Sequence, residues 1–133
     1  MALPHHLLVI DDDAFIGRMV ALNFSHGPFR VSTAGDGAAA LAFLREHPDV
    51  EVVLVDVNLP GRSGLDVMEE ARGDAALPRV AWMVLTGTGE SASAERAAAL
   101  GAAAFVTKPF SPKKLYRQVC ELVGERAAPG ETT

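Results

Sequence analysis

The fold is decided by Leu7-Leu8-Val9-Ile10-Asp11-Asp12-Asp13, a run of large apolar residues that ends abruptly on three carboxylates. Later in the chain, Val52-Val53-Leu54-Val55-Asp56 repeats the pattern of an apolar run followed by an acid. Continuous runs of Val, Ile and Leu are typical of parallel strands buried on both faces, and open α/β sheets build their sites just beyond the carboxyl ends of such strands. The two stretches therefore predict an acidic site at one edge of a parallel sheet.

An acidic site of this kind requires a cation. Two carboxylates a few Å apart repel each other by roughly 1 kcal/mol in water and by about 4 kcal/mol at an intermediate dielectric constant. Mg²⁺ prefers oxygen ligands, keeps several of its waters, and is commonly held by one or two carboxylates together with a phosphate. We therefore expect Mg²⁺ at the ends of these strands.

The rest of the chain alternates between strand-like and helix-like segments. Apolar runs predict five strands, at residues 7–10, 29–34, 52–55, 80–85 and 104–107. Apolar residues at helical spacing predict helices after Asp13, at residues 38–46, 65–72 and 91–100, and from Pro112 to Leu122. Five repeats of a strand and a helix predict an α/β fold whose parallel sheet is covered on both faces.

Three residues mark ends of the predicted helices. We expect Asp13 to cap the first helix rather than bind a metal ion, because carboxylates at the amino end of a helix gain from free amides and the helix dipole. Ser111 is a candidate cap for the last helix. Gly101 follows the alanine-rich helix at residues 91–100, in the position just past a helix end.

Polar side chains also follow the other strands of the predicted sheet. Asn58 comes two residues after Asp56, Thr86 ends the fourth strand, and Lys108 follows the fifth. A phosphoryl group in transfer spreads negative charge over its oxygens, which a metal ion, a lysine ammonium and a threonine hydroxyl can stabilise. Lys108 precedes Pro109, and a cis bond, which costs little before proline, would turn the lysine towards the site. The strand ends together predict a site for a metal ion and a phosphoryl group.

Taken together, the motifs at the strand ends resemble the receiver domain of two-component response regulators. The motifs are Leu7-Leu8-Val9-Ile10-Asp11-Asp12-Asp13, Leu54-Val55-Asp56-Val57-Asn58-Leu59-Pro60-Gly61, Leu85-Thr86-Gly87 and Thr107-Lys108-Pro109-Phe110. The resemblance covers about residues 7–123. It implies a flavodoxin-like (βα)5 fold with a doubly wound five-stranded parallel sheet and the strand order 2-1-3-4-5.

The resemblance also implies a role for each polar residue at the strand ends. Asp56 would be the phosphoacceptor, and Thr86 and Lys108 would contact the bound phosphoryl group. Mg²⁺ would be held by Asp11, Asp12, Asp56 and the backbone carbonyl of Asn58. The implied donor is the phosphohistidine of a sensor histidine kinase or of a histidine phosphotransfer protein, and attack by the Asp56 carboxylate on phosphorus gives an acyl phosphate.

The output implied by the resemblance is a change of conformation. New contacts to the phosphoryl group would bias a two-state element that controls an unknown partner or output domain. Phe105 stands where the family often has tyrosine, and both a switching aromatic and a plain core residue are open interpretations at this position. The domain would act as a monomer or as a phosphorylation-linked dimer.

Two other function classes were considered. A Mg²⁺-dependent phosphatase or phosphotransferase of the haloacid dehalogenase type would also use an aspartyl phosphate, but it carries a second aspartate two residues after the nucleophile, where this chain has Asn58. A degenerate receiver that serves only as an interaction module would not need the complete set of polar residues. We therefore expect a signalling domain that assists its own phosphorylation and is not an enzyme.

Composition sets the remaining expectations. The 133 residues predict one domain, at 1–123, followed by a flexible tail or the start of a linker at 124–133. The net charge of −5 and the lack of a basic run predict no direct nucleic-acid binding. No stretch is long and apolar enough to cross a membrane and no signal peptide is evident, so we expect a cytoplasmic protein. We expect His5-His6 to form an unstructured lead-in to the first strand.

Overall fold

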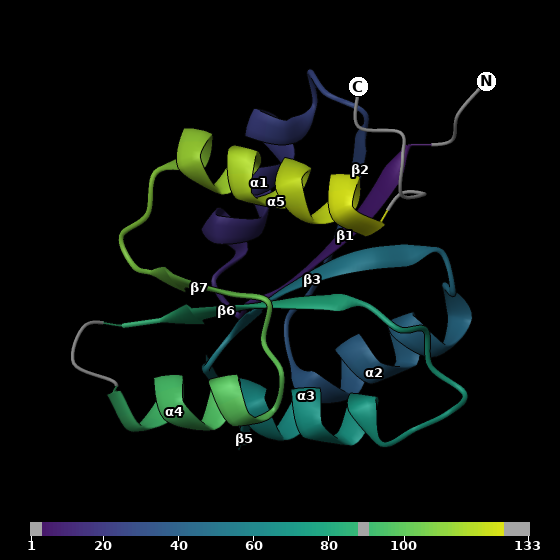
Figure 1. The fold of residues 1–133 in the computed structure, drawn as a ribbon, viewed down its shortest axis with the longest axis vertical. Helices are drawn as coiled ribbons and strands as arrows, with labels where there is room; N and C mark the ends of the chain where they lie inside the picture. Colours follow the sequence, from purple (N-terminus) through teal and green to yellow (C-terminus); the bar gives the residue numbers. More distant parts are fainter. Residues whose placement is uncertain (1–3, 88–90, 127–133) are drawn as a thin grey trace.

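The computed structural model describes residues 4–87 and 91–126, and its centre is a parallel five-stranded sheet (Figure 1). The strands of the sheet are β1 (His5–Ile10), β2 (Phe29–Ala34), β3 (Val50–Asp56), β6 (Ala81–Thr86) and β7 (Ala104–Thr107). Their order across the sheet is β2-β1-β3-β6-β7. Counted along the main sheet alone, this is the predicted order 2-1-3-4-5, so the predicted flavodoxin-like fold is confirmed.

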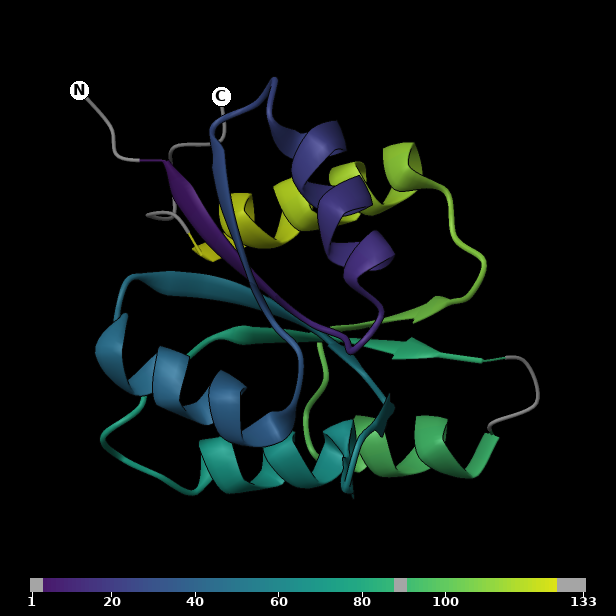
Figure 2. The same cartoon turned by 180° about the vertical axis from the view of Figure 1, so that it is seen from behind.

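The helices cover both faces of the sheet (Figures 1 and 2). They are α1 (Ala14–Phe24), α2 (Gly37–Glu46), α3 (Gly64–Arg72), α4 (Ser91–Ala99) and α5 (Pro112–Arg126). Helices α1 and α5 lie on one face, and α2, α3 and α4 lie on the other. Within the described ranges, no helix has both the length and the apolar character needed to cross a membrane.

The interior strand β1 contributes to two hydrophobic cores, one on each face of the sheet. Leu8 and Ile10 belong to the core under α2 and α3, whereas Leu7 and Val9 belong to the core under α1 and α5. Alternate residues of a strand point to opposite faces, so a strand buried on both faces must be apolar at every position. This requirement explains the continuous apolar run Leu7-Leu8-Val9-Ile10.

Capping side chains fix the helix starts. The Asp13 side chain accepts a hydrogen bond from the Phe15 amide at 3.0 Å, as predicted for a helix cap. The Ser111 hydroxyl accepts one from the Lys114 amide at 3.2 Å, so this cap is confirmed as well. Gly101 has a φ of +90°, a left-handed conformation that glycine adopts without strain, and it follows the end of α4 as predicted.

Side chains of α3 and α4 tie these two helices together. The Arg96 guanidinium on α4 lies 2.7 Å from Asp66 and 3.0 Å from Glu69, both on α3. The hydrogen bonds that Arg96 donates to these two carboxylates raise its pKa, and the bond to Asp66 lowers the pKa of that carboxyl. The three side chains are partly exposed, so solvent screens the ion pairs.

Two features of the fold differ from the sequence expectations. His5-His6 is part of β1 and not an unstructured lead-in, and the His6 side chain is buried. A short antiparallel pair, β4 (Asn58–Leu59) and β5 (Arg62–Ser63), joins β3 to α3 and was not predicted. Two-residue strands carry no alternating pattern that a sequence could show.

Candidate functional site

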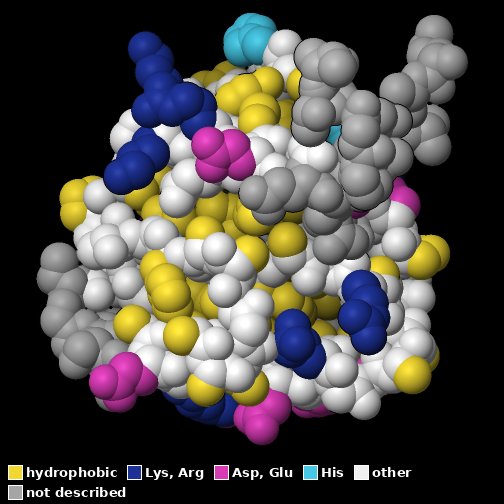
Figure 3. Space-filling view, in the orientation of Figure 1, with side chains coloured by type: hydrophobic (Ala, Val, Ile, Leu, Met, Phe, Trp, Pro, Cys, Tyr) yellow, Lys and Arg dark blue, Asp and Glu magenta, His cyan; other side chains and the backbone are white. Residues whose placement is uncertain are grey.

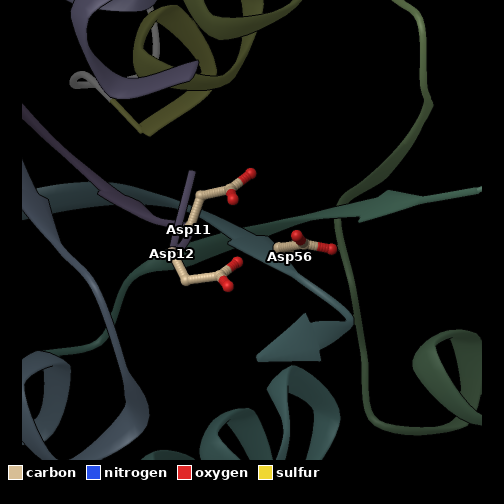
Figure 4. Close-up of side chains that lie close together, drawn as sticks. All are labelled: Asp11, Asp12 and Asp56. Atoms are coloured by element: carbon tan, nitrogen blue, oxygen red, sulfur yellow. The ribbon is translucent and has the colours of Figure 1, made fainter. Parts of the chain in front are cut away.

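Three carboxylates meet at the carboxyl ends of β1 and β3, and Figure 4 shows their side chains together. One oxygen each of Asp11, Asp12 and Asp56 lies within 4.8 Å of the other two. The pairing of Ile10 with Val55 explains the convergence, because it brings the ends of the two strands side by side. Asp11 and Asp56 are buried and Asp12 is exposed, so the cluster opens to solvent on one side.

Lys108 supplies the cation of the cluster. Its Nζ lies 2.9 Å from Asp56 Oδ2 and 3.2 Å from Asp11 Oδ2. Burial alone would lower the pKa of Lys108, but hydrogen bonds and the negative charges of Asp56 and Asp11 outweigh burial and raise it. The amine therefore stays protonated at neutral pH. The Lys108–Pro109 bond is cis, as expected.

Asp11 is a buried carboxylate whose surroundings raise its pKa. Burial raises the pKa of Asp11, and the nearby charge of Asp56 adds to this effect, although the Asp13 amide and Lys108 oppose it. Its Oδ1 accepts a hydrogen bond from the Asp13 amide at 2.9 Å. Its buried Oδ2 faces Lys108 as an ion pair but has no hydrogen-bond partner among residues 4–87 and 91–126. A buried oxygen with unused lone pairs, beside two further carboxylates, fits a hard divalent cation.

The backbone around Asp56 is held by the start of α3. Asp56 Oδ1 accepts a hydrogen bond from the Asn58 amide at 3.0 Å, and the Gly64 amide donates to the Val57 carbonyl at 2.8 Å. A Cβ atom on Gly64 would overlap the Asp56 carbonyl oxygen. Gly64 was not predicted from the sequence, where the only signal is a glycine at the start of a helix. The structure shows that its φ is not positive, so the backbone conformation does not require glycine there.

The other candidate residues lie at neighbouring strand ends. Thr86 ends β6, its side chain is buried, and its carbonyl accepts a hydrogen bond from the Lys108 amide at 2.8 Å. Asn58 is exposed at the start of β4. The structure thus brings Asp11, Asp12, Asp56 and Lys108 into one cluster and places Thr86 and Asn58 on the segments that border it.

A groove opens beside the exposed edge of the carboxylate cluster. Its volume is about 560 Å³, which leaves room for a phosphoryl group and part of its donor. The lining residues come from the β1 end, the β4–β5 pair and α4, and they include Asp12, Asn58, Pro60, Arg62 and Ser93. A ligand in this groove can therefore meet Asp12, the exposed member of the cluster.

Phe105 on β7 is not a core residue. It is 39% exposed, and Figure 3 shows hydrophobic side chains reaching the surface on the face of the molecule that carries β7. The interpretation of a plain core phenylalanine is therefore wrong. An exposed aromatic on the last strand of the sheet has room to change its rotamer.

The sequence identifies the family that this site belongs to. Residues 7–120 match the sequence model of the response regulator receiver domain. The chain is a member of that family. The receiver domain matches nearly all of the described chain, and all of the site residues lie inside the matched range.

Curated relatives of this receiver are response regulators. The chain is 36% identical over 118 residues to the DNA-binding response regulator MtrA of Mycobacterium tuberculosis, a match that covers 88% of the chain and 50% of MtrA. It is 40% identical over 124 residues to the probable transcriptional regulatory protein TcrX of the same organism, with coverages of 90% and 50%. The chain spans about half the length of these relatives.

Solved receiver structures share the fold. The chemotaxis response regulator CheY4 of Vibrio cholerae superposes with a TM-score of 0.81 at 26% identity, covering 90% of this chain and 98% of that one. A putative response regulator from Chloroflexus aurantiacus superposes with a TM-score of 0.82 at 26% identity, covering 91% and 98%. Both matches cover at least 90% of this chain, so the receiver fold is shared over most of its length.

One sequence expectation is overturned by the relatives. We expected no direct nucleic-acid binding, because the chain is acidic and has no basic run. MtrA is a DNA-binding response regulator, so the expectation was wrong as a statement about this kind of protein. The match covers only half of MtrA. The net charge of the receiver half therefore does not indicate how the complete relative binds DNA.

Proposed function

We propose that Asp56 of this receiver accepts a phosphoryl group from a phosphohistidine donor, with the help of Mg²⁺, Lys108 and Thr86. The observation that carries the proposal is the contact between the buried Asp56 carboxylate and the Lys108 ammonium at 2.9 Å, beside the acidic pair Asp11 and Asp12. This arrangement provides a nucleophile, a fixed cation and metal ligands within one cluster.

The roles of the chain's own groups follow from the geometry. A carboxylate oxygen of Asp56 attacks phosphorus, the new O–P bond forms as the P–N bond of the donor breaks, and the leaving imidazole nitrogen keeps the electron pair. Lys108 is already in place to balance charge on the transferred oxygens, and it needs no reorganisation during the reaction. The Thr86 hydroxyl is the candidate hydrogen-bond donor to the phosphoryl group.

Asp11, Asp12, Asp56 and the Asn58 backbone carbonyl are the candidate Mg²⁺ ligands. When bound, the ion supplies charge neutralisation and a template for the phosphoryl oxygens. The buried Oδ2 of Asp11, which has no hydrogen-bond partner in the described part of the chain, supports this ligand set.

The sequence analysis placed a tail or linker at 124–133, but residues 124–126 belong to α5, so we further propose that the receiver extends to Arg126 and that a tail or linker follows it. The output of this receiver is inferred from relatives that are named DNA-binding or transcriptional regulators, and it is the control of a DNA-binding activity by phosphorylation. A sensor histidine kinase or a histidine phosphotransfer protein is the proposed donor.

The proposal is tested by labelling with acetyl phosphate and Mg²⁺, followed by intact mass measurement of the wild type and Asp56→Asn. One phosphoryl group is expected on the wild type and none on the variant. Asp74→Asn is the matched control, because Asp74 also accepts a backbone hydrogen bond but lies outside the cluster. Equal labelling of wild type and Asp56→Asn would refute the assignment.

A hydrolytic enzyme with an aspartyl-phosphate intermediate is the competing function. The position that would carry its acid–base group is Asn58, whose side chain does not ionise. We therefore propose that the domain is not an enzyme towards other molecules. Stoichiometric labelling without turnover of small phosphate esters is expected, and continuous turnover would favour the enzyme.

A further inference from the structure

His6 is a buried histidine at the end of β1 that lies away from the phosphoacceptor site. Strand β1 runs from His5 and His6 to the acidic cluster at its other end (Figure 2). The His6 side chain is 2% exposed, and its ring meets Phe43 and His47 edge-on, with centroids 5.6 Å and 6.0 Å away. Its Nε2 lies 2.8 Å from the Ser32 hydroxyl on β2. The proposed phosphoryl chemistry does not use this residue.

The other ring nitrogen of His6 has two incompatible partners. Nδ1 lies 2.8 Å from Asp49 Oδ2 and 2.9 Å from Arg30 Nη2. A guanidinium can only donate a hydrogen bond, and a carboxylate can only accept one. Because Nδ1 carries either a lone pair or a proton, it can satisfy only one of these partners at a time.

Strand pairing on both sides of β1 places His6 beside these partners. On one side, His6 pairs directly with Arg30 of β2. On the other side, His6 pairs with Val50 and Leu7 pairs with Val52, so the register between β1 and β3 shifts between His6 and Leu7, next to Asp49. Such irregularities change the direction of nearby side chains and are a common device for positioning functional groups.

We propose that His6 is a proton-operated switch that exchanges Arg30 for Asp49 as its Nδ1 partner. In the neutral ring, Nδ1 accepts a hydrogen bond from Arg30 and Nε2–H donates to Ser32. A proton taken from solvent adds to the Nδ1 lone pair, and the new N–H donates to Asp49. Arg30 then leaves Nδ1 and keeps its direct contact with Asp49, at 2.6 Å.

The charged groups around His6 are consistent with this exchange. Burial raises the pKa of Asp49, but hydrogen bonds and the charges of His6 and Arg30 outweigh burial and lower it, so its carboxylate stays an acceptor where histidines titrate. His47, at the end of α2, has its Nδ1 3.0 Å from the Phe43 carbonyl, an acceptor that fixes a proton on that nitrogen. The neighbouring His5 pairs with Glu51 on β3 instead of with Asp49.

Ser32, His6 and Asp49 lie in the order of the Ser-His-Asp triad of hydrolases. The position of the nearby cavity argues against catalysis by these residues. A cavity of about 700 Å³ next to Asp49 is lined by His5, Asp49 and Glu51, and neither Ser32 nor His6 lines it. A substrate in this cavity would not meet the serine. The arrangement therefore serves proton exchange at Nδ1 and not acyl transfer.

The test follows the His6 ring signals by NMR between about pH 5 and 8, the range in which histidines titrate. The signals are assigned with His6→Gln. Arg30→Gln removes the positive charge that favours the neutral ring, and Asp49→Asn removes the negative charge that favours the protonated ring. The proton affinity of His6 is expected to rise in the first variant and fall in the second, each by about twofold to fivefold, as for a partly exposed ion pair. Arg30 and Asp49 are both more than half exposed, at 55% and 51%, so both variants are expected to fold.

The matched controls are Arg45→Gln and Asp74→Asn, which break an ion pair of 3.1 Å and similar exposure elsewhere on the surface. Both controls are expected to leave the His6 titration unchanged. Shifts of the same sign in Arg30→Gln and Asp49→Asn, or no shift in either, would overturn the proposal. The readout does not involve phosphorylation, so the result is independent of the function proposed for Asp56.

Discussion

The ammonium of Lys108 lies 2.9 Å from the Asp56 carboxylate and 3.2 Å from that of Asp11, so one cation bridges acids from two neighbouring strands. Without Lys108, the two buried carboxylates would lose the ion pairs that compensate their charge among residues 4–87 and 91–126. The same ammonium is the group best positioned to balance the negative charge of an incoming phosphoryl group.

Replacing Lys108 by glutamine is expected to slow labelling of Asp56 by acetyl phosphate by about two orders of magnitude, the usual loss when one preorganised charge-stabilising donor is removed. The measurement is a time course of intact mass at saturating Mg²⁺. Lys113→Gln changes an exposed lysine of α5 and is expected to label at the wild-type rate. A Lys108→Gln rate within a factor of two of wild type would argue against the proposed role.

Asp11→Asn is expected to stabilise the Mg²⁺-free protein at neutral pH. Burial raises the pKa of Asp11, so the folded chain binds this proton more tightly than the unfolded chain does. The ionised group therefore costs stability at neutral pH, and the cost disappears as the pH falls through the raised pKa. We expect a gain of about 1 kcal/mol at pH 7, the size of a like-charge repulsion in water.

Chemical unfolding in EDTA at a series of pH values measures this effect. The advantage of Asp11→Asn should shrink as the solution becomes more acidic and should be absent below pH 3.8, the ordinary value for this carboxyl. An advantage that grows on acidification would contradict the sign of the pKa shift.

Mg²⁺ is expected to raise the free energy of unfolding of the wild type, by about 2.7 kcal/mol when the free ion is at one hundred times its dissociation constant. Asp12→Asn removes an exposed ligand of the cluster and should abolish most of this gain. Asp13→Asn keeps the helix cap and should preserve the gain, since Asp13 is not among the three converging carboxylates. Equal Mg²⁺ responses in the two variants would rule out the proposed ligand set.

Gly64→Ala is expected to destabilise the fold by about 1–3 kcal/mol, because the added methyl group would overlap the Asp56 carbonyl oxygen. It should also slow labelling of Asp56, since the carbonyl belongs to the phosphoacceptor. Gly124→Ala is the control: a methyl group there meets no atom within 4 Å, and alanine favours the helix by up to about 1 kcal/mol. Urea unfolding of the two variants should therefore give changes of opposite sign.

Arg96→Gln is expected to speed backbone amide exchange in α4, because it removes both ion pairs to α3. Glu95→Gln changes the charge of the same helix without touching either pair, and exchange in α4 should then resemble wild type. Exchange in β1 and β3 serves as the internal reference for global unfolding. Unchanged α4 protection in Arg96→Gln would mean that the two pairs do not hold the helix.

Much of the fold could be predicted from the sequence because its central strands are buried on both faces. That environment requires apolar residues at every position, so the runs before Asp11 and Asp56 stand out without any structure. The acidic cluster was predictable because acids follow two of these apolar runs, and parallel strands end at the same edge of the sheet. The strand order came from the family resemblance, not from the apolar pattern.

What could not be predicted depends on contacts between distant segments. His6 looks like a polar lead-in, and its burial results from a shift in strand register and from partners at Ser32 and Asp49. The close approach of Gly64 to the Asp56 carbonyl has no local pattern either. The expectation about nucleic-acid binding failed because it rested on the net charge of this chain alone. The DNA-binding relative MtrA is about twice as long as the part that matches this chain.

Helix α3 touches the phosphoacceptor at one end and holds α4 along its side. Its first residue, Gly64, packs against the Asp56 backbone. Its Asp66 and Glu69 form ion pairs with Arg96 of α4. The helix has nine residues and is therefore about 13 Å long. A displacement at the carboxyl end of β3 would therefore reach α4 through the nine residues of α3.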